Sequence, residues 1–345
     1  MGMKELNLEI KLSYVTGLRS IVLNEINKKK VFHVRREVGD SIYLDYVSNL
    51  DEVRELRSVA RAYVVSQDTK YNPLYISNHK SILGCLIEAV IAGNEDEFKT
   101  FKITCAGSDS PEIRDISEYI KKTYKLIETE ESDLKIHIIK IEDEWEVGIQ
   151  STPRPLSLRN YKVRHMSGAM DPTIAYALNS LCELERAESY LNIFSGSATL
   201  LIEAGLCYPK LKEIVGFDNN KKHLSLAIQN VKEAGLIQKA RLKEADIFDK
   251  PDLGRFDAIT SDLPFGMVVS KNEDLETLYR TFIEYCEEKL LPNGTLGVYT
   301  SEYEIIESIL RKSRFKIFQS LQLKLPTNVG GYLRPKIIVC KLQTS

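Results

Sequence analysis

Residues 190–199 read YLNIFSGSAT, and this stretch decides the fold of the C-terminal half of the chain. Its first five residues, 190–194, are mostly apolar and predict a short buried strand. The small residues that follow predict a tight turn, with a helix from Thr199 to Leu206. Glycine at such a turn lets backbone N–H groups approach a ligand, and the helix N-terminus adds a partial positive charge. An ordinary strand-to-helix turn is the alternative interpretation.

The same alternation of short strands and longer helices continues along the C-terminal half. It predicts an α/β, doubly wound domain whose parallel sheet is covered on both faces. Ligands of such sheets lie beyond the carboxyl ends of the strands. Near the C-terminus two strand-like runs flank a glycine pair and predict an antiparallel hairpin at the sheet edge. The expected strands are 190–194, 213–217, 240–244, 256–261 and 294–299, and the expected hairpin runs are 316–325 and 335–342.

The first 150 residues lack this rhythm and mix alternating strands with amphipathic helices, which predicts two small α+β units. They are followed by residues 151–164, STPRPLSLRNYKVR, which contain two prolines. No acidic residue occurs between Val147 and Met170. This composition predicts a linker whose basic side chains can meet phosphates, although a solvated linker explains the composition equally well. The four basic residues are Arg154, Arg159, Lys162 and Arg164.

Composition excludes several classes of protein. The 345 residues include 47 Lys and Arg against 49 Asp and Glu, and the formal charge of −2 excludes a globally basic nucleic-acid binder. Six scattered cysteines without a CxxC pair predict reduced thiols in a cytoplasmic protein and no metal site. No window approaches the roughly 20 apolar residues of a membrane span, so no membrane association is expected.

Acidic residues follow the second and third expected strands. Asp218 lies roughly 20 residues after the glycine turn, the spacing at which a carboxylate binds a ribose diol. Asp246 follows the third strand and can accept a hydrogen bond from an adenine amino group. This arrangement is shared by NAD enzymes and by methyltransferases that use S-adenosylmethionine. Each acid taken alone is also compatible with a surface or helix-capping role.

The fourth expected strand ends in Asp262-Leu263-Pro264-Phe265. The Asp262 carboxylate and the Leu263 carbonyl can both accept hydrogen bonds from an exocyclic amine. Pro264 stiffens the backbone that aims them, and the Phe265 ring can stack on a base. This order predicts a site that binds a planar group with an exocyclic amine. The simpler alternative is that Phe265 packs in the core and Asp262 caps a helix.

Together these motifs resemble the Rossmann-fold methyltransferases that act on exocyclic amines. The resemblance is more specific to the THUMP-containing tRNA guanine-N2 methyltransferases. It rests on Leu263 in the fourth motif and on three further segments, RNYKVR at 159–164, MDPTIA at 170–175 and YLRP at 332–335.

The resemblance implies the domain order and the substrate. It implies four parts in this order: a ferredoxin-like domain at 1–60, a THUMP RNA-binding domain at 61–152, a basic linker at 153–165 and the methyltransferase domain at 166–345. The implied activity is formation of N2-methylguanosine in the acceptor stem of tRNA, often at position 6. The implied partner is tRNA, and no obligatory protein partner or metal is inferred.

The resemblance and the strand-end motifs also assign site residues. The four residues Asp262, Leu263, Pro264 and Phe265 are expected to hold the flipped guanine. The residues expected to bind S-adenosylmethionine are Thr173, Phe194, Ser195, Gly196, Ser197, Thr199, Asp218, Asn219, Asp246, Ile247 and Asp262. The residues expected to contact RNA are Arg154, Arg159, Lys162 and Arg164.

Two positions depart from the family pattern. Asn192 replaces the leading acid of the first motif, which removes a charge near the cofactor, and Ala198 restricts the backbone angles where glycine is usual. We expect cofactor binding to survive both changes. Two alternatives remain open: guanine-N2 methylation of ribosomal RNA or adenine-N6 methylation of nucleic acid, and an RNA-binding protein whose catalytic domain has decayed.

Overall fold

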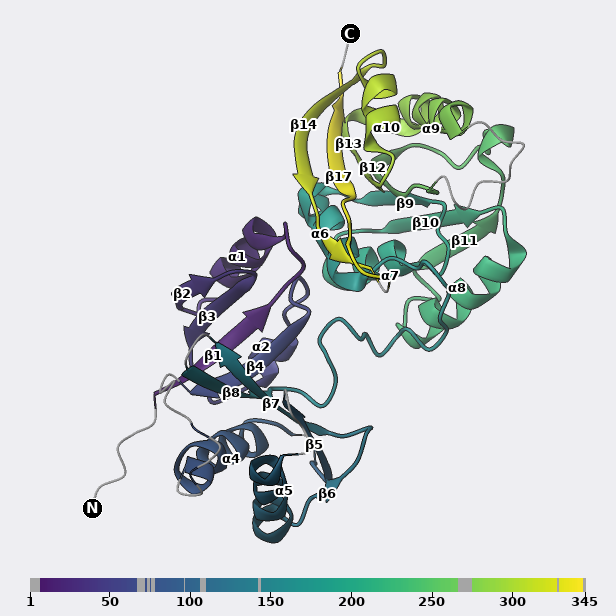
Figure 1. Cartoon of the computed structure of the whole chain (residues 1–345). Helices are drawn as coiled ribbons and strands as arrows, with labels where there is room; N and C mark the ends of the chain where they lie inside the picture. Colours follow the sequence, from purple (N-terminus) through teal and green to yellow (C-terminus); the bar gives the residue numbers. More distant parts are fainter. Residues whose placement is uncertain are drawn as a thin grey trace. The chain divides into compact units, whose positions relative to one another are not determined.

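The chain forms two compact units in its computed structural model (Figure 1). One unit comprises Met1–Tyr14 and Val22–Leu158, and the other comprises Val15–Ile21 and Arg159–Ser345. The division at residue 158 falls inside the segment predicted to be a linker. The structure describes residues 7–66, 72, 75, 78–95, 97–105, 110–141, 144–265, 275–327 and 329–343.

The first unit carries a single eight-stranded sheet with the order β2-β3-β1-β4-β8-β7-β5-β6. Its first four strands and two helices follow one another as βαββαβ, with antiparallel pairing throughout, which is the ferredoxin-like arrangement. The fourth strand of this arrangement extends to Ser66 and thus lies beyond the boundary expected at residue 60. These elements are β1 (Leu8–Ser13), α1 (Arg19–Lys28), β2 (Val34–Val38), β3 (Ser41–Asp45), α2 (Asp51–Arg54) and β4 (Arg61–Ser66).

The rest of the first unit continues the same sheet, because β8 pairs antiparallel with β4. The strand β7 pairs antiparallel with β8, and β5 pairs parallel with β7. The helix α5 begins at a Ser110 side-chain cap with proline in its first turn. These elements are the π-helical turn His79–Leu83, α4 (Gly84–Ala92), β5 (Thr100–Cys105), α5 (Pro111–Tyr124), β6 (Ile127–Glu128), β7 (Leu134–Ile141) and β8 (Glu144–Gln150).

The second unit is built on a seven-stranded sheet with the order β11-β10-β9-β12-β13-β17-β14. The chain moves outward from β9 to β10 and β11, then returns to the other side of β9 with β12. The switch point therefore lies between β9 and β12, where ligands of doubly wound sheets bind. Its first strands and helices are α6 (Pro172–Leu181), β9 (Ser189–Ile193), α7 (Thr199–Cys207), β10 (Glu213–Asp218), α8 (Lys221–Glu233), β11 (Ala240–Glu244) and β12 (Phe256–Asp262).

The last strands differ in position from the sequence-based expectation. The strand β17 lies between β13 and β14 and is antiparallel to both, so the hairpin folds back into the sheet and only β14 forms the edge. Sequence periodicity predicted two antiparallel strands but carried no information on which one would pair with β13. The remaining elements are α9 (Leu275–Lys289), β13 (Leu290–Thr300), α10 (Tyr303–Leu310), β14 (Phe315–Gln322), β15 (Leu325–Pro326), β16 (Tyr332–Leu333) and β17 (Lys336–Leu342).

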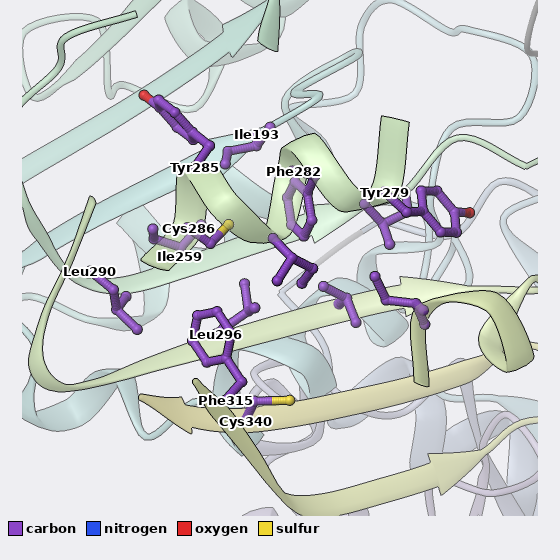
Figure 2. Close-up of a cluster of buried hydrophobic side chains, with 14 of the residues drawn as sticks. Ile193, Ile259, Tyr279, Phe282, Tyr285, Cys286, Leu290, Leu296, Phe315 and Cys340 are labelled. Atoms are coloured by element: carbon purple, nitrogen blue, oxygen red, sulfur yellow. The ribbon is translucent and has the colours of Figure 1, made fainter. Parts of the chain in front are cut away.

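A hydrophobic core packs α9 and α10 against one face of this sheet (Figure 2). Phe282 and Cys286 of α9 are fully buried against Ile259 and Leu296 of the central strands. Burial of such side chains contributes about 25 cal/mol for each Å² of apolar surface removed from water. The core thus holds β9 and β12 rigidly, and with them the loops at their carboxyl ends. None of the helices in the described parts of the chain is long and apolar enough to cross a membrane.

Candidate functional site

The turn after β9 has an unusual backbone. Phe194, Gly196 and Ala198 all have left-handed conformations, with φ values of 55°, 51° and 66°. Such angles cost free energy for residues other than glycine, and they concentrate at functional sites. Alternating left- and right-handed residues also turn successive backbone N–H groups toward one side, where they can meet an anion.

The helix α7 starts directly after this turn without a side-chain cap. Its N-cap residue is Ala198, which has no side-chain oxygen to accept from the first backbone N–H groups. The neighbouring hydroxyls of Ser197 and Thr199 are buried and lie 3.4 Å apart. An uncapped helix N-terminus next to a left-handed turn fits the carboxylate of a bound amino acid.

Asp218 at the end of β10 holds the turn in place. Its Oδ2 accepts a hydrogen bond from the Gly196 backbone N–H, with 2.9 Å between the atoms. Its Oδ1 accepts from the backbone N–H of Asn220, also at 2.9 Å. The side chain is nearly buried, with 7% exposure, and His223 Nδ1 lies 3.4 Å from Oδ1, so Oδ2 is the oxygen that keeps a second acceptor direction. Sequence reasoning predicted a ligand role for Asp218 but missed its contact with the turn.

The acid predicted after the third strand, Asp246, lies close to the end of the second strand. Asp246 Oδ2 accepts from the Asn219 side-chain amide at 3.0 Å, and its Oδ1 accepts from the backbone N–H of Phe248. Asp246 thus caps the short 3₁₀ helix Ile247–Asp249, in which Ile247 is buried. The structure therefore brings Asp218, Asn219 and Asp246 together beyond the ends of β10 and β11.

Asp262 ends β12 beside Tyr299 of β13, the residue with which it is in register. Burial raises the pKa of the Asp262 carboxyl to about 7. Burial and then the nearby Asp262 charge raise the pKa of Tyr299 above its usual value. A carboxyl with this pKa can accept a proton near neutral pH.

Two tyrosines brace the loop that follows Asp262. The Tyr279 hydroxyl donates to the Pro264 carbonyl at 2.9 Å and lies 3.0 Å from the Thr300 hydroxyl. The rings of Phe265 and Tyr299 are 6.0 Å apart at an angle of 54°. The Leu263 side chain is buried in the core, so only its backbone can reach a ligand. Sequence reasoning missed both tyrosines, although Tyr299 ends an expected neighbouring strand.

Three of the residues expected to bind the cofactor also make contacts within the protein. Thr173 is fully buried, and its hydroxyl donates to Asp171, the N-cap of α6, at 2.6 Å. The Phe194 ring stacks on Phe282 of α9, with 6.0 Å between ring centroids. The Ser195 hydroxyl donates to the Asn192 carbonyl, which stabilises the turn from within.

The predicted RNA-binding role of Arg159 is not supported by its surroundings. Its guanidinium is 7% exposed and forms an ion pair with the fully buried Glu203 of α7, at 3.0 Å. Burial opposes its charge, but the Glu203 charge and hydrogen bond outweigh that effect and raise its pKa. Tyr161 donates to the same carboxylate at 2.8 Å. Lys162 donates to the Met170 carbonyl, so it too serves internal structure.

The other two basic residues of the segment are exposed. Arg154 belongs to the first unit and Arg164 to the second. The backbone N–H of Arg164 donates to Asn230 Oδ1 at 2.9 Å, and Asn230 Nδ2 donates to both Arg164 O and Ser197 O. Asn230 is fully buried in α8, and it therefore joins this segment to the glycine turn. No sequence pattern indicated that connection.

Asn192 is also buried, in β9 just before the turn. Its Nδ2 donates to the backbone carbonyls of Ile193 and Thr260, at 3.3 and 3.2 Å, which links β9 to β12. Its Oδ1 has no hydrogen-bond partner among the described residues. The side-chain amide supplies two donors that an aspartate lacks, so Asn192 stabilises the switch point rather than merely removing a charge.

Comparisons with known proteins found a match to a methyltransferase family model over part of the chain. Residues 159–329 match the family model described as the RMKL-like methyltransferase domain of UPF0020. Within the described residues, no group of three or more side chains could hold a metal ion.

Curated relatives align with part of the chain. It is 26% identical over 204 residues to a tRNA (guanine(6)-N2)-methyltransferase of Thermus thermophilus, covering 58% of this chain and 60% of that protein. It is 30% identical over 166 residues to the bovine U6 snRNA (guanine-N(2))-methyltransferase THUMPD2, covering 48% and 32%. The alignments therefore span less than two thirds of these relatives.

Solved structures share the fold along nearly the whole chain. TrmN from Thermus thermophilus aligns with a TM-score of 0.74 at 20% identity, covering 97% of this chain and 100% of that one. SMU.472, a putative methyltransferase solved with SAH, aligns with a TM-score of 0.70 at 15% identity, covering 99% and 100%. At these identities the similarity establishes the fold.

Proposed function

Residues 159–329 match the UPF0020 RMKL-like methyltransferase domain, and from this match we propose that the protein transfers a methyl group to N2 of guanosine in tRNA. The observation that carries this proposal is the placement of three acids, Asp218, Asp246 and Asp262, at successive strand ends around one switch point. Asp218 contacts the glycine turn, Asp246 accepts from the neighbouring Asn219, and Asp262 begins the motif expected to hold a planar amine.

S-adenosylmethionine is the methyl donor that this domain would use. The uncapped N-terminus of α7 and the turn at Gly196 would hold its carboxylate end. Asp218 would accept from the ribose hydroxyls through its remaining lone pairs, and Asp246 with Asn219 would face the adenine. When bound there, the cofactor supplies an electrophilic methyl group.

The acceptor half of the site would be formed by Asp262 to Phe265. The Asp262 carboxylate and the Leu263 carbonyl would accept hydrogen bonds from the guanine amine, and the Phe265 ring would stack on the base. As N2 forms its new bond to carbon, it becomes cationic and must lose a proton. Asp262 would accept that proton, which its raised pKa favours. Tyr279 would hold the loop in place through the Pro264 carbonyl.

The choice of tRNA rests on the relatives and on the sequence motifs. The Thermus relative is named for the guanine at position 6 of tRNA, and we propose an acceptor-stem guanine here as well. A target within a helical stem would have to be extruded from the stack. The second half of the first unit, up to residue 152, would act as the THUMP domain that contacts the RNA.

Another guanine-N2 substrate is the second candidate, because one relative is named for U6 snRNA. The hydrogen-bond acceptors and the ring at Asp262 to Phe265 do not distinguish between these RNAs, and they do not distinguish guanine from adenine. Transfer of labelled methyl to bulk tRNA, ribosomal RNA, U6 snRNA and DNA, each as sole acceptor, tests the choice. We expect incorporation into tRNA; incorporation only into another acceptor would overturn the tRNA assignment.

Calorimetric titration with S-adenosylmethionine separates the enzyme from a decayed RNA-binding protein. The left-handed Ala198 and the Asn192 amide both preserve the turn, so we expect saturable binding. Absence of binding at millimolar cofactor would refute the proposed activity.

A further inference from the structure

The last part of the chain has a charge distribution unlike the rest. Residues 308–345 contain eight Lys and Arg and no Asp or Glu, whereas residues 1–307 contain 39 basic and 49 acidic residues. A cationic segment in an otherwise acidic chain indicates a surface for a polyanion. Three of the eight cations are in ion pairs, Lys336 and Arg311 with Glu307, and Lys341 with Glu183.

Part of this segment lies at the catalytic edge of the sheet. Asp262 is in register with Tyr299, Tyr299 with Ile337, and Ile337 with Leu321. The strand spacing puts β17 about 10 Å from β12 along this row. The chain between β14 and β17, which carries the β15–β16 hairpin, therefore leaves the sheet at the same edge as Asp262. In Figure 1 it follows the arrowhead of β14.

The β15–β16 hairpin exposes an aromatic ring beside two cations. Tyr332 is 59% exposed, and the Lys324 ammonium lies 3.9 Å from the centroid of its ring. Arg334 is exposed two residues further on. Within the described parts of the chain, neither cation has a carboxylate at ion-pair distance. An exposed ring with unpaired cations is the combination that binds a single-stranded nucleic acid, through base stacking and phosphate contacts.

A second ring lies beside the first residue of β17. Tyr303 begins α10 just after β13, and the Lys336 ammonium lies 4.0 Å from its ring centroid. Lys336 is itself in register with Thr300 at the end of β13. Aromatic residues thus occur in the register row of Asp262 at Tyr299, beside the start of β17 at Tyr303, and in the hairpin at Tyr332.

We propose that the β15–β16 hairpin binds unpaired RNA nucleotides that flank the target base. A base would stack on Tyr332, and adjacent phosphates would contact Lys324 and Arg334. This inference rests on the proposed function, because it extends the RNA-binding surface of the same active site. It also explains how a chain with a slightly acidic total charge presents a local cationic surface to RNA.

Binding of bulk tRNA to the full chain, measured by filter retention over a range of salt concentrations, tests the proposal. Tyr332→Ala should weaken binding about tenfold, because stacking on one base is lost, while Tyr332→Phe should bind like the wild type. Lys324→Ala/Arg334→Ala should reduce the slope of log affinity against log salt by about 1.4, which is two phosphate contacts.

The same segment offers a matched control pair. Lys312 and Arg314 are exposed cations before β14, at the opposite end of that strand, where Phe315 is in register with Leu342. Lys312→Ala/Arg314→Ala should leave the salt slope unchanged. S-adenosylmethionine affinity and melting temperature, measured on every variant, should stay at the wild-type values because none of these residues contacts the cofactor turn.

Wild-type affinity and salt slope in the hairpin variants would overturn the inference, as would an equal loss in the control pair. If the wild type methylates tRNA while the hairpin variants bind it normally, only this inference fails. A wild-type protein that binds and methylates no RNA would refute the proposed function together with it.

Discussion

The Asp218 carboxylate accepts a hydrogen bond from the backbone N–H of Gly196, 2.9 Å away, and so joins the end of β10 to the turn after β9. Asp218 ends one strand and Gly196 follows the neighbouring strand, at the point expected for cofactor binding. The acid thus has two tasks, because the same nearly buried group anchors the turn and would contact the ribose.

Substitution of Asp218 should separate these tasks. Asp218→Ala leaves the N–H groups of Gly196 and Asn220 without their acceptor, so we expect a loss of about 1–3 kcal/mol in stability and at least tenfold in cofactor affinity. Asp218→Asn keeps one acceptor oxygen and should lose affinity with less destabilisation. Urea unfolding and calorimetric titration measure the two effects, with the exposed Asp252→Asn as control. Unchanged cofactor affinity in Asp218→Ala would remove this residue from the site.

Ala198 is strained, so glycine should stabilise the protein. A left-handed conformation costs about 1–2 kcal/mol for an L-residue, and glycine avoids that cost. Glycine also gives the unfolded chain more conformational freedom, which lowers stability by about 0.5–1 kcal/mol. Ala198→Gly should therefore raise the free energy of unfolding by about 0.5 kcal/mol, measured by urea titration. Gly196→Ala, at another left-handed position of the turn, is the matched opposite and should destabilise. A lower stability in Ala198→Gly would contradict the backbone described here.

Restoring the acid usual in the family should harm this protein. In Asn192→Asp the carboxylate would face the carbonyls of Ile193 and Thr260, to which the amide now donates. We expect a loss of about 2 kcal/mol or more at pH 8 and a smaller loss at low pH, where the new acid is protonated. Thermal unfolding across pH measures this difference. Equal or greater stability at pH 8 would show that the amide donors contribute nothing.

Asp262 should make stability depend on pH. Its folded pKa of about 7 is above the unfolded value of 3.8, so the folded state binds the proton more tightly. Stability from this group is fully present below about pH 4 and is lost as pH rises to about 7, at about 1.4 kcal/mol for each pKa unit. Asp262→Asn should remove that dependence and be more stable than the wild type at pH 8. Parallel pH profiles of the two proteins would contradict the raised pKa.

Sequence patterns predicted the parallel sheet and the strand-end acids because each depends on local periodicity and spacing. The strand containing Asn192, the turn at Gly196 and the end of β12 at Asp262 lie where the pattern predicted them. Contacts distant in sequence were not predictable in this way. The burial of Arg159 against Glu203, 44 residues away, follows from tertiary packing, and a run of basic residues looks the same whether its members face solvent or a buried acid. The insertion of β17 beside β13 is likewise a choice between pairings of equal local propensity.

The identity of the methylated nucleoside tests the central claim most directly. Bulk tRNA lacking this modification would be incubated with the full-length protein and S-adenosylmethionine, digested, and analysed by liquid chromatography and mass spectrometry, with Asp262→Ala as the matched inactive variant. The account predicts N2-methylguanosine with the wild type and none with Asp262→Ala, although that variant still binds the cofactor. A product carrying its methyl group on adenine N6, or the same yield of N2-methylguanosine from Asp262→Ala, would contradict it.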